Sequence, residues 1–138
     1  MSTVLKTVYN IDTSLYDICI NIPGGMPVEG PSAGVALLVC AYSAITGRSV
    51  RNKIAITGEL SIRGEVLPVG GVKAKIEAAA AADADTVIIP ADNNCEGFSD
   101  LEIKVVPVRS ITEVTELVFG KEQQKEQELR IAAPVRND

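Results

Sequence analysis

One short segment combines a hydroxyl nucleophile with a strongly constrained backbone. Residues 30–34 read Gly-Pro-Ser-Ala-Gly, which places Ser32 where a loop leads into an apolar helix. Backbone N–H groups at such a helix start, together with the positive end of the helix dipole, can hold a developing oxyanion. The alternative is a purely structural serine, because serine is a favoured N-cap residue and caps helices without doing chemistry.

A serine nucleophile needs a base, and the sequence contains no histidine to supply one. A Ser-His-Asp triad within this chain is therefore excluded. The sequence Gly-Gly-Val-Lys-Ala-Lys-Ile at residues 70–76 offers two lysines at a predicted helix start. On a helical wheel Lys75 borders the apolar face of that helix. Lys73 is instead predicted to pair with Glu77 on the surface, an arrangement that contributes little.

A lysine amine acts as a general base near neutral pH only when it is uncharged. That requires a pKa about three units below the ordinary ~10.4, a cost of about 4 kcal/mol that apolar surroundings supply. Thr57 ends a predicted strand, and its hydroxyl is a candidate to orient the neutral amine. The structural alternative for Lys75 is a lysine whose stem lies on the core while its amine stays in water.

The three cysteines, Cys19, Cys40 and Cys95, are scattered and odd in number. They form no Cys-x-x-Cys motif, and without histidine they match neither a disulfide framework nor a zinc site. Free thiols are typical of a reducing, cytosol-like compartment. Cys40 falls within a helix predicted to be buried, where thiols are normally inert, so a thiol enzyme is the weakest candidate function.

The elements that must position these groups follow from the hydrophobic pattern. A helix that is apolar on every side is predicted from Ser32 to about Thr46, and such a helix belongs in the middle of a domain. Further helices are predicted over 72–82 and 110–119, and strands over 17–22, 54–57, 61–69 (a pair that bends near Arg63 and Gly64), 86–89 and 102–106. The strands within 54–69 are predicted to be antiparallel. The pattern indicates a single α+β domain with a mixed sheet and a buried central helix.

Length and charge limit the classes of function. The 138 residues leave room for one domain, predicted over residues 1–120, followed by a charged helical extension or tail over 121–138. With 13 basic and 18 acidic residues the net charge is −5, which gives no overall attraction to nucleic acid or anionic lipid. The longest apolar run, Ala33 to Ile45, is shorter than the ~20 residues that a membrane span needs, and no signal peptide is visible.

Several motifs together resemble the proteolytic domain of the ATP-dependent Lon proteases. They are Gly-Pro-Ser-Ala-Gly at 30–34, Thr-Gly-Glu at 57–59, Arg-Gly at 63–64, Val-Leu-Pro-Val-Gly-Gly at 66–71 and Lys-Ala-Lys at 73–75. They occur in the order of that family, and the likeness runs from about Ile20 to Pro90. The resemblance implies a serine endopeptidase with a Ser-Lys dyad, in which Ser32 is the nucleophile, Lys75 is the base and Thr57 lies near the amine.

The resemblance also implies the setting of this activity. It implies an α+β fold related to a ribosomal-protein domain, unfolded or damaged polypeptides as substrates, a homo-oligomer built as a hexameric ring, and a cytoplasmic location. Peptide cleavage itself needs no cofactor, whereas ATP and magnesium are implied for an ATPase module whose Walker motif is absent from this sequence. Upstream strands of the family domain are expected to be missing. Glu29 stands where the family often has an acidic residue, and a solvated loop carboxylate is its alternative.

Two functions of other classes stay open at this point. The first is a non-enzymatic interaction domain, in which Ser32 caps a helix and Lys75 lies on the surface. The second is a phosphate-binding α/β domain that uses Gly-Gly-Val-Lys at residues 70–73, because helix N-termini bind anions. A serine-reactive phosphonate that labels Ser32 contradicts the first, and thermal stabilisation by ATP favours the second.

Overall fold

The structure, a computed structural model, describes residues 1–24, 30–94, 98 and 101–120. Its main sheet has the strand order β1-β4-β5 and is parallel throughout. The strands of this sheet are β1 (Ile54–Ile56), β4 (Thr86–Pro90) and β5 (Lys104–Val108). A separate antiparallel pair consists of β2 (Glu59–Leu60) and β3 (Val66–Leu67). The predicted α+β class with mixed strand pairing is confirmed.

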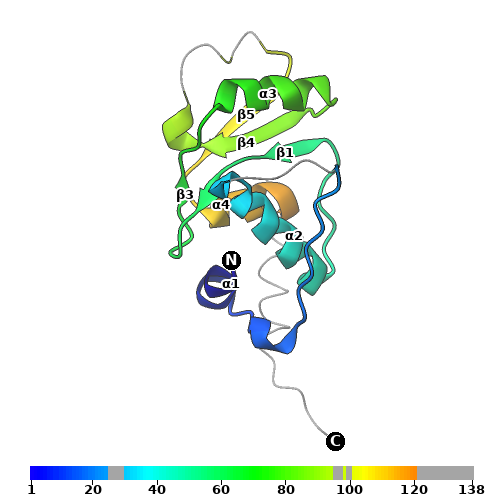
Figure 1. The fold of residues 1–138 in the computed structure, drawn as a ribbon, viewed down its shortest axis with the longest axis vertical. Helices are drawn as coiled ribbons and strands as arrows, with labels where there is room; N and C mark the ends of the chain where they lie inside the picture. The colour runs from blue at the N-terminus through cyan, green and yellow to red at the C-terminus, as the bar shows by residue number, and fades with distance from the viewer. Residues whose placement is uncertain (25–29, 95–97, 99–100, 121–138) are drawn as a thin grey trace, which may run out of the picture.

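Helices cover both faces of the main sheet. They are α1 (Ser2–Tyr9), α2 (Gly34–Thr46), α3 (Val72–Ala81) and α4 (Ile111–Phe119). Figure 1 shows α3 on one face of the sheet and α2 with α4 on the other, with α1 beyond them. The strand β4 serves both sides, because Ile88 joins the core around α2 whereas Val87 and Ile89 join the core under α3. This alternation is the two-residue period of a strand buried on both faces.

The predicted central helix is α2. Its buried residues are Val35, Leu38, Val39, Ala41, Tyr42 and Thr46. The ring of Tyr42 lies 4.8 Å from that of Tyr9 in α1 and 5.2 Å from that of Phe119 in α4, which ties the three helices together. Cys40 is exposed, so its predicted burial is wrong. One side of α2 is therefore not covered by the rest of the described structure. None of the helices in the described ranges is long and apolar enough to cross a bilayer.

Two predicted elements differ from the structure, and a third is not tested by it. The predicted strand 17–22 does not form and pairs with no strand in the described part of the chain, and Ile20 and Ile22 are 51% and 49% exposed. An alternating pattern suits a strand, but a strand forms only where a neighbour accepts its hydrogen bonds. The predicted antiparallel segment 54–69 is wrong at its start, because β1 pairs in parallel with β4. The predicted tail over 121–138 lies outside the described residues.

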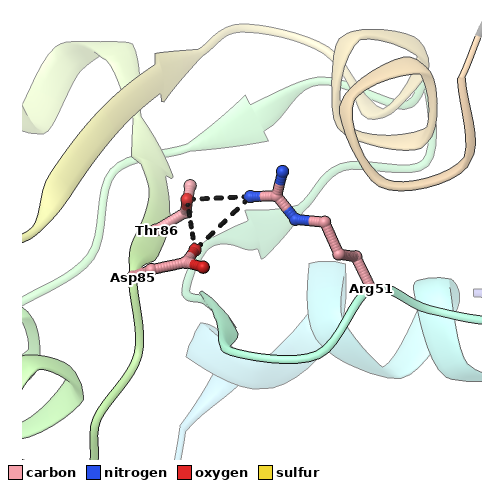
Figure 2. Close-up of polar contacts among 3 residues, drawn as sticks. All are labelled: Arg51, Asp85 and Thr86. Carbon is pink, nitrogen blue, oxygen red and sulfur yellow. Dashed lines mark hydrogen bonds and ion pairs between the residues drawn. The ribbon is translucent and has the colours of Figure 1, made fainter.

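Polar side chains join the amino ends of β1 and β4. Arg51 Nη2 donates to Thr86 Oγ1 at 2.9 Å and lies 3.4 Å from Asp85 Oδ1 (Figure 2). The Thr86 hydroxyl in turn donates to Asp85 Oδ1 at 2.7 Å. The charged side chains of Arg51 and Asp85 are more than half exposed, so their ion pair contributes little. These contacts lie at the sheet edge opposite to the carboxyl ends of the strands.

Candidate active site

Ser32 lies in η2 (Pro31–Ala33), a single 3-10 turn that leads into α2. Gly30 precedes the turn with a φ of 82°, a left-handed conformation that glycine adopts without strain. The N-cap of α2 is Ala33, and no side chain caps this helix. The helix therefore begins two residues later than predicted, and the explanation of Ser32 as an N-cap is wrong. Ser32 is half-buried, and its hydroxyl forms no hydrogen bond with any described residue.

The residues after β1 hold this turn in place. Gly58 N–H donates to the carbonyl of Ser32 at 2.9 Å, and Val35 N–H donates to the carbonyl of Gly58 at 3.2 Å. Thr57 N–H donates to Ile88 O at 3.0 Å, which fixes Thr57 to the neighbouring strand. The buried Thr57 hydroxyl makes a long contact of 3.5 Å with the carbonyl oxygen of Ser32. The structure thus brings Thr57 and Ser32 together.

Gly58 fits a space that admits no side chain, which leads to a testable prediction. A Cβ at this position would lie 2.9 Å from Val66 Cγ1 and 3.0 Å from Val35 Cγ2. Valine side chains are stiff at χ1, so Gly58→Ala is expected to lower the free energy of unfolding by about 1–3 kcal/mol. Urea unfolding measures this. Gly70→Ala is the matched control, because a Cβ there meets nothing within 4 Å, and equal losses in both variants would contradict the prediction.

Lys75 lies in the first turn of α3, where its N–H donates to Gly71 O at 3.1 Å. It is half-buried whereas Lys73 is exposed, as the helical wheel predicts. The next residue, Ile76, is completely buried against the sheet. The predicted ion pair between Lys73 and Glu77, both described, does not form. In an exposed ion pair of this kind, the electrostatic attraction barely offsets the conformational entropy lost by ordering two long side chains.

The start of α3 lies at the carboxyl edge of the main sheet. The loop before α3 is bound to η3 (Ala91–Asn93), the 3-10 turn that directly follows β4, through two hydrogen bonds between Asn93 and Val69. Figure 1 shows α2 and α3 both beginning toward the side where β4 ends. Ligands of parallel sheets bind at this edge. Ser32, Thr57 and the first turn of α3 therefore belong to one edge of the sheet.

Ser32 Oγ and Lys75 Nζ, both described, are not hydrogen-bonded in this structure. Catalytic hydrogen bonds are often long in an enzyme without substrate and tighten in the complex. The direct pairing of the two side chains therefore stays a prediction. Glu29 and Cys95 lie outside the described residues, whereas Cys19 and Cys40 are both unpaired and exposed.

A hollow of about 450 Å³ borders the turn that carries Ser32. Its walls are mostly apolar, and they are formed by Met1, Ile22, Gly30, Pro31, Ala33, Gly34, Leu37, Glu59 and Leu60. The lining residues include the two on either side of Ser32 in the sequence. The hollow therefore offers space for an apolar group directly beside the serine.

Sequence reasoning missed two residues of this site. Gly58 enters the sequence analysis only as part of a family motif, and its lack of a side chain is what lets Val66 of β3 and Val35 of α2 pack this closely against it. Asn93 was not singled out at all. The only feature of the sequence that points to Asn93 is its position, three residues after the proline that ends a run of apolar strand residues.

A family model, the Lon protease (S16) C-terminal proteolytic domain, matches residues 3–121 of the chain. The chain belongs to this family. Membership in the Lon family confirms the predicted resemblance, and it favours a proteolytic function over the interaction and phosphate-binding alternatives.

Individual Lon proteases show the same relationship. The chain is 42% identical over 118 residues to Lon protease 2 of Bacillus subtilis strain 168, covering 85% of the chain and 21% of that protein. It is 42% identical over 144 residues to the archaeal Lon protease of Archaeoglobus fulgidus, covering 96% of the chain and 23% of that protein. The chain thus spans less than a quarter of the length of these relatives.

Proposed function

We propose that this Lon domain is the proteolytic part of an ATP-dependent serine endopeptidase, with Ser32 as nucleophile and Lys75 as general base. The observation that carries the proposal is that Ser32 has no structural role as a cap and is held in place by its backbone. This serine caps no helix, and the backbone of Gly58 holds it at the carboxyl edge of the sheet. Membership in a family of proteolytic domains supports the same function.

The first half of the reaction forms an acyl-enzyme. Ser32 Oγ bonds to the scissile carbonyl carbon while its proton passes to the neutral amine of Lys75. The N–H groups of Gly34 and Val35 are already bonded to the carbonyls of Pro31 and Gly58. We therefore assign the oxyanion to the N–H groups of Ser32 and Ala33. As the C–N bond breaks, the leaving amine takes the proton from the ammonium group.

The second half regenerates the serine. Water attacks the acyl carbon, and the amine of Lys75 accepts a proton from it. When the ester bond breaks, this proton returns to Ser32 Oγ and the carboxylic acid product leaves. We assign to the Thr57 hydroxyl, which lies 3.5 Å from the carbonyl oxygen of Ser32, the role of orienting the amine during both halves. No cofactor takes part in these bond changes.

The substrates that we propose are unfolded or damaged polypeptides. The apolar hollow beside Ser32 supports this, because unfolded chains expose apolar side chains that it can accept. We further propose that ATP and magnesium act in a separate ATPase module that feeds the substrate, that the complete protein forms a homo-oligomeric hexameric ring, and that it works in the cytoplasm. These three proposals rest on the Lon family alone.

A fluorophosphonate probe tests the proposed nucleophile on the chain itself. Intact mass spectrometry is expected to show one added phosphonyl group, and peptide mapping is expected to locate it on Ser32. The Ser32→Ala variant is expected to remain unlabelled, and Ser49→Ala, which changes an exposed serine, is the matched control. Labelling that is absent from the wild-type chain, or that persists in Ser32→Ala, would contradict the proposal.

A further inference from the structure

The side-chain amide of Asn93 uses both of its polar groups on a single residue. Val69 N–H donates to Asn93 Oδ1 at 2.7 Å, and Asn93 Nδ2 donates to Val69 O at 2.9 Å. Only one orientation of the amide satisfies both bonds, because one amide atom accepts and the other donates. Among the described residues, Val69 has no backbone-to-backbone hydrogen bond. Asn93 therefore takes the place that a neighbouring strand would fill.

Asn93 stands on a rigid part of the fold. It closes η3, which follows directly on β4, and all five residues of β4 are buried between two parallel neighbours. The turn is closed by Asn94 N–H, which donates to Ala91 O at 3.0 Å. The neighbouring Asp92 also lies 3.0 Å from Arg109. Buried central strands are the least mobile parts of a domain, so the position of the amide is well fixed.

The helix α3, which follows Val69, is held much less firmly by the packing of its own residues. Ile76 is the single buried residue among the ten of α3, and five of the others are alanines, which interdigitate little. The N-cap, Gly71, has a φ of 64° and offers no side-chain cap. Gly70 before it has no neighbour that a Cβ would touch. Two consecutive glycines leave such a loop with many accessible conformations.

We propose that Asn93 is a positioning residue for the catalytic base. By binding both backbone groups of Val69, it fixes the loop that begins α3 and so sets where the amine of Lys75 lies relative to Ser32. The inference rests on the proposed function, because it assigns Asn93 a role only if Lys75 acts on Ser32. Asn93 acts through the backbone and touches no reacting atom.

The rate of Ser32 labelling by the fluorophosphonate, measured from pH 6 to 11, tests this proposal. Asn93→Ala is expected to lower the rate on the alkaline plateau by about ten- to a hundredfold, because a displacement of about 1 Å costs that much. The dependence of the rate on pH is also expected to change, because the proton acceptor no longer lies at the serine. Loss of stability alone would change neither quantity at temperatures where thermal unfolding shows the variant to be folded.

Asn94→Ala is the matched control, because its exposed side chain makes no hydrogen bond with the described residues. If Asn93→Ala fails to fold, Asn93→Asp replaces it. The carboxylate still accepts from Val69 N–H but cannot donate to Val69 O, and its plateau rate is expected to fall as well. Plateau rates equal to that of Asn94→Ala would overturn the positioning role. Labelling of wild-type Ser32 that does not depend on Lys75 would instead overturn the proposed function itself.

Discussion

Replacing Lys75 by alanine is expected to slow fluorophosphonate labelling of Ser32 by about 10²- to 10⁴-fold, the usual contribution of a general base. Without the amine, the serine proton passes only to water, and the hydroxyl is a weak nucleophile. The measurement is the rate constant of labelling, followed by intact mass spectrometry from pH 6 to 11.

Lys73→Ala is the matched control on the same helix turn. Lys73 is exposed whereas Lys75 is half-buried, so the two side chains differ in burial although they share one part of the helix. Removing Lys73 is expected to leave the labelling rate near that of the wild type. If Lys73→Ala loses labelling and Lys75→Ala retains it, the assignment of the base is wrong.

Local patterns predicted much of the fold. The helix over 72–82 and the strand over 86–89 are confirmed as α3 and β4, because a glycine pair, an alanine-rich run and an apolar run ended by proline each specify local structure. Ser110 caps α4 by accepting from Glu113 N–H at 3.3 Å, and the three-residue spacing of this pair has the capping-box form. These features depend on residues only a few positions apart.

Tertiary geometry explains what the sequence did not reveal. The parallel pairing of β1 with β4 joins strands some thirty residues apart, and alternation of residue type carries no strand direction. The 3-10 turn at Ser32 arises where the backbone of Gly58 bonds to η2. The bonds between Asn93 and Val69 also cross from one loop to another. The candidate nucleophile and base were found from residue types, whereas the residues that hold them required coordinates.

Ile76→Ala is expected to lower the free energy of unfolding by about 2–5 kcal/mol, the usual cost of a large-to-small change in a packed core. Ile76 is 0% exposed, and its cluster contains Val87, Ile89, Phe98 and Ile103. The cost should lie toward the upper end of this range. The alanines around Ile76 on α3 are too short to fill the cavity, so the site can collapse little. Urea unfolding of the wild type and the variant measures the difference.

Glu77→Ala is the matched control for this substitution, because Glu77 is the next residue of α3 and is exposed. It is expected to change stability by less than about 0.5 kcal/mol. Ile76→Ala should also slow the labelling of Ser32 under conditions where the variant is folded, because Ile76 holds against the sheet the helix that carries Lys75. A destabilised variant that labels Ser32 at the wild-type rate would show that the packing of α3 does not govern the position of the base.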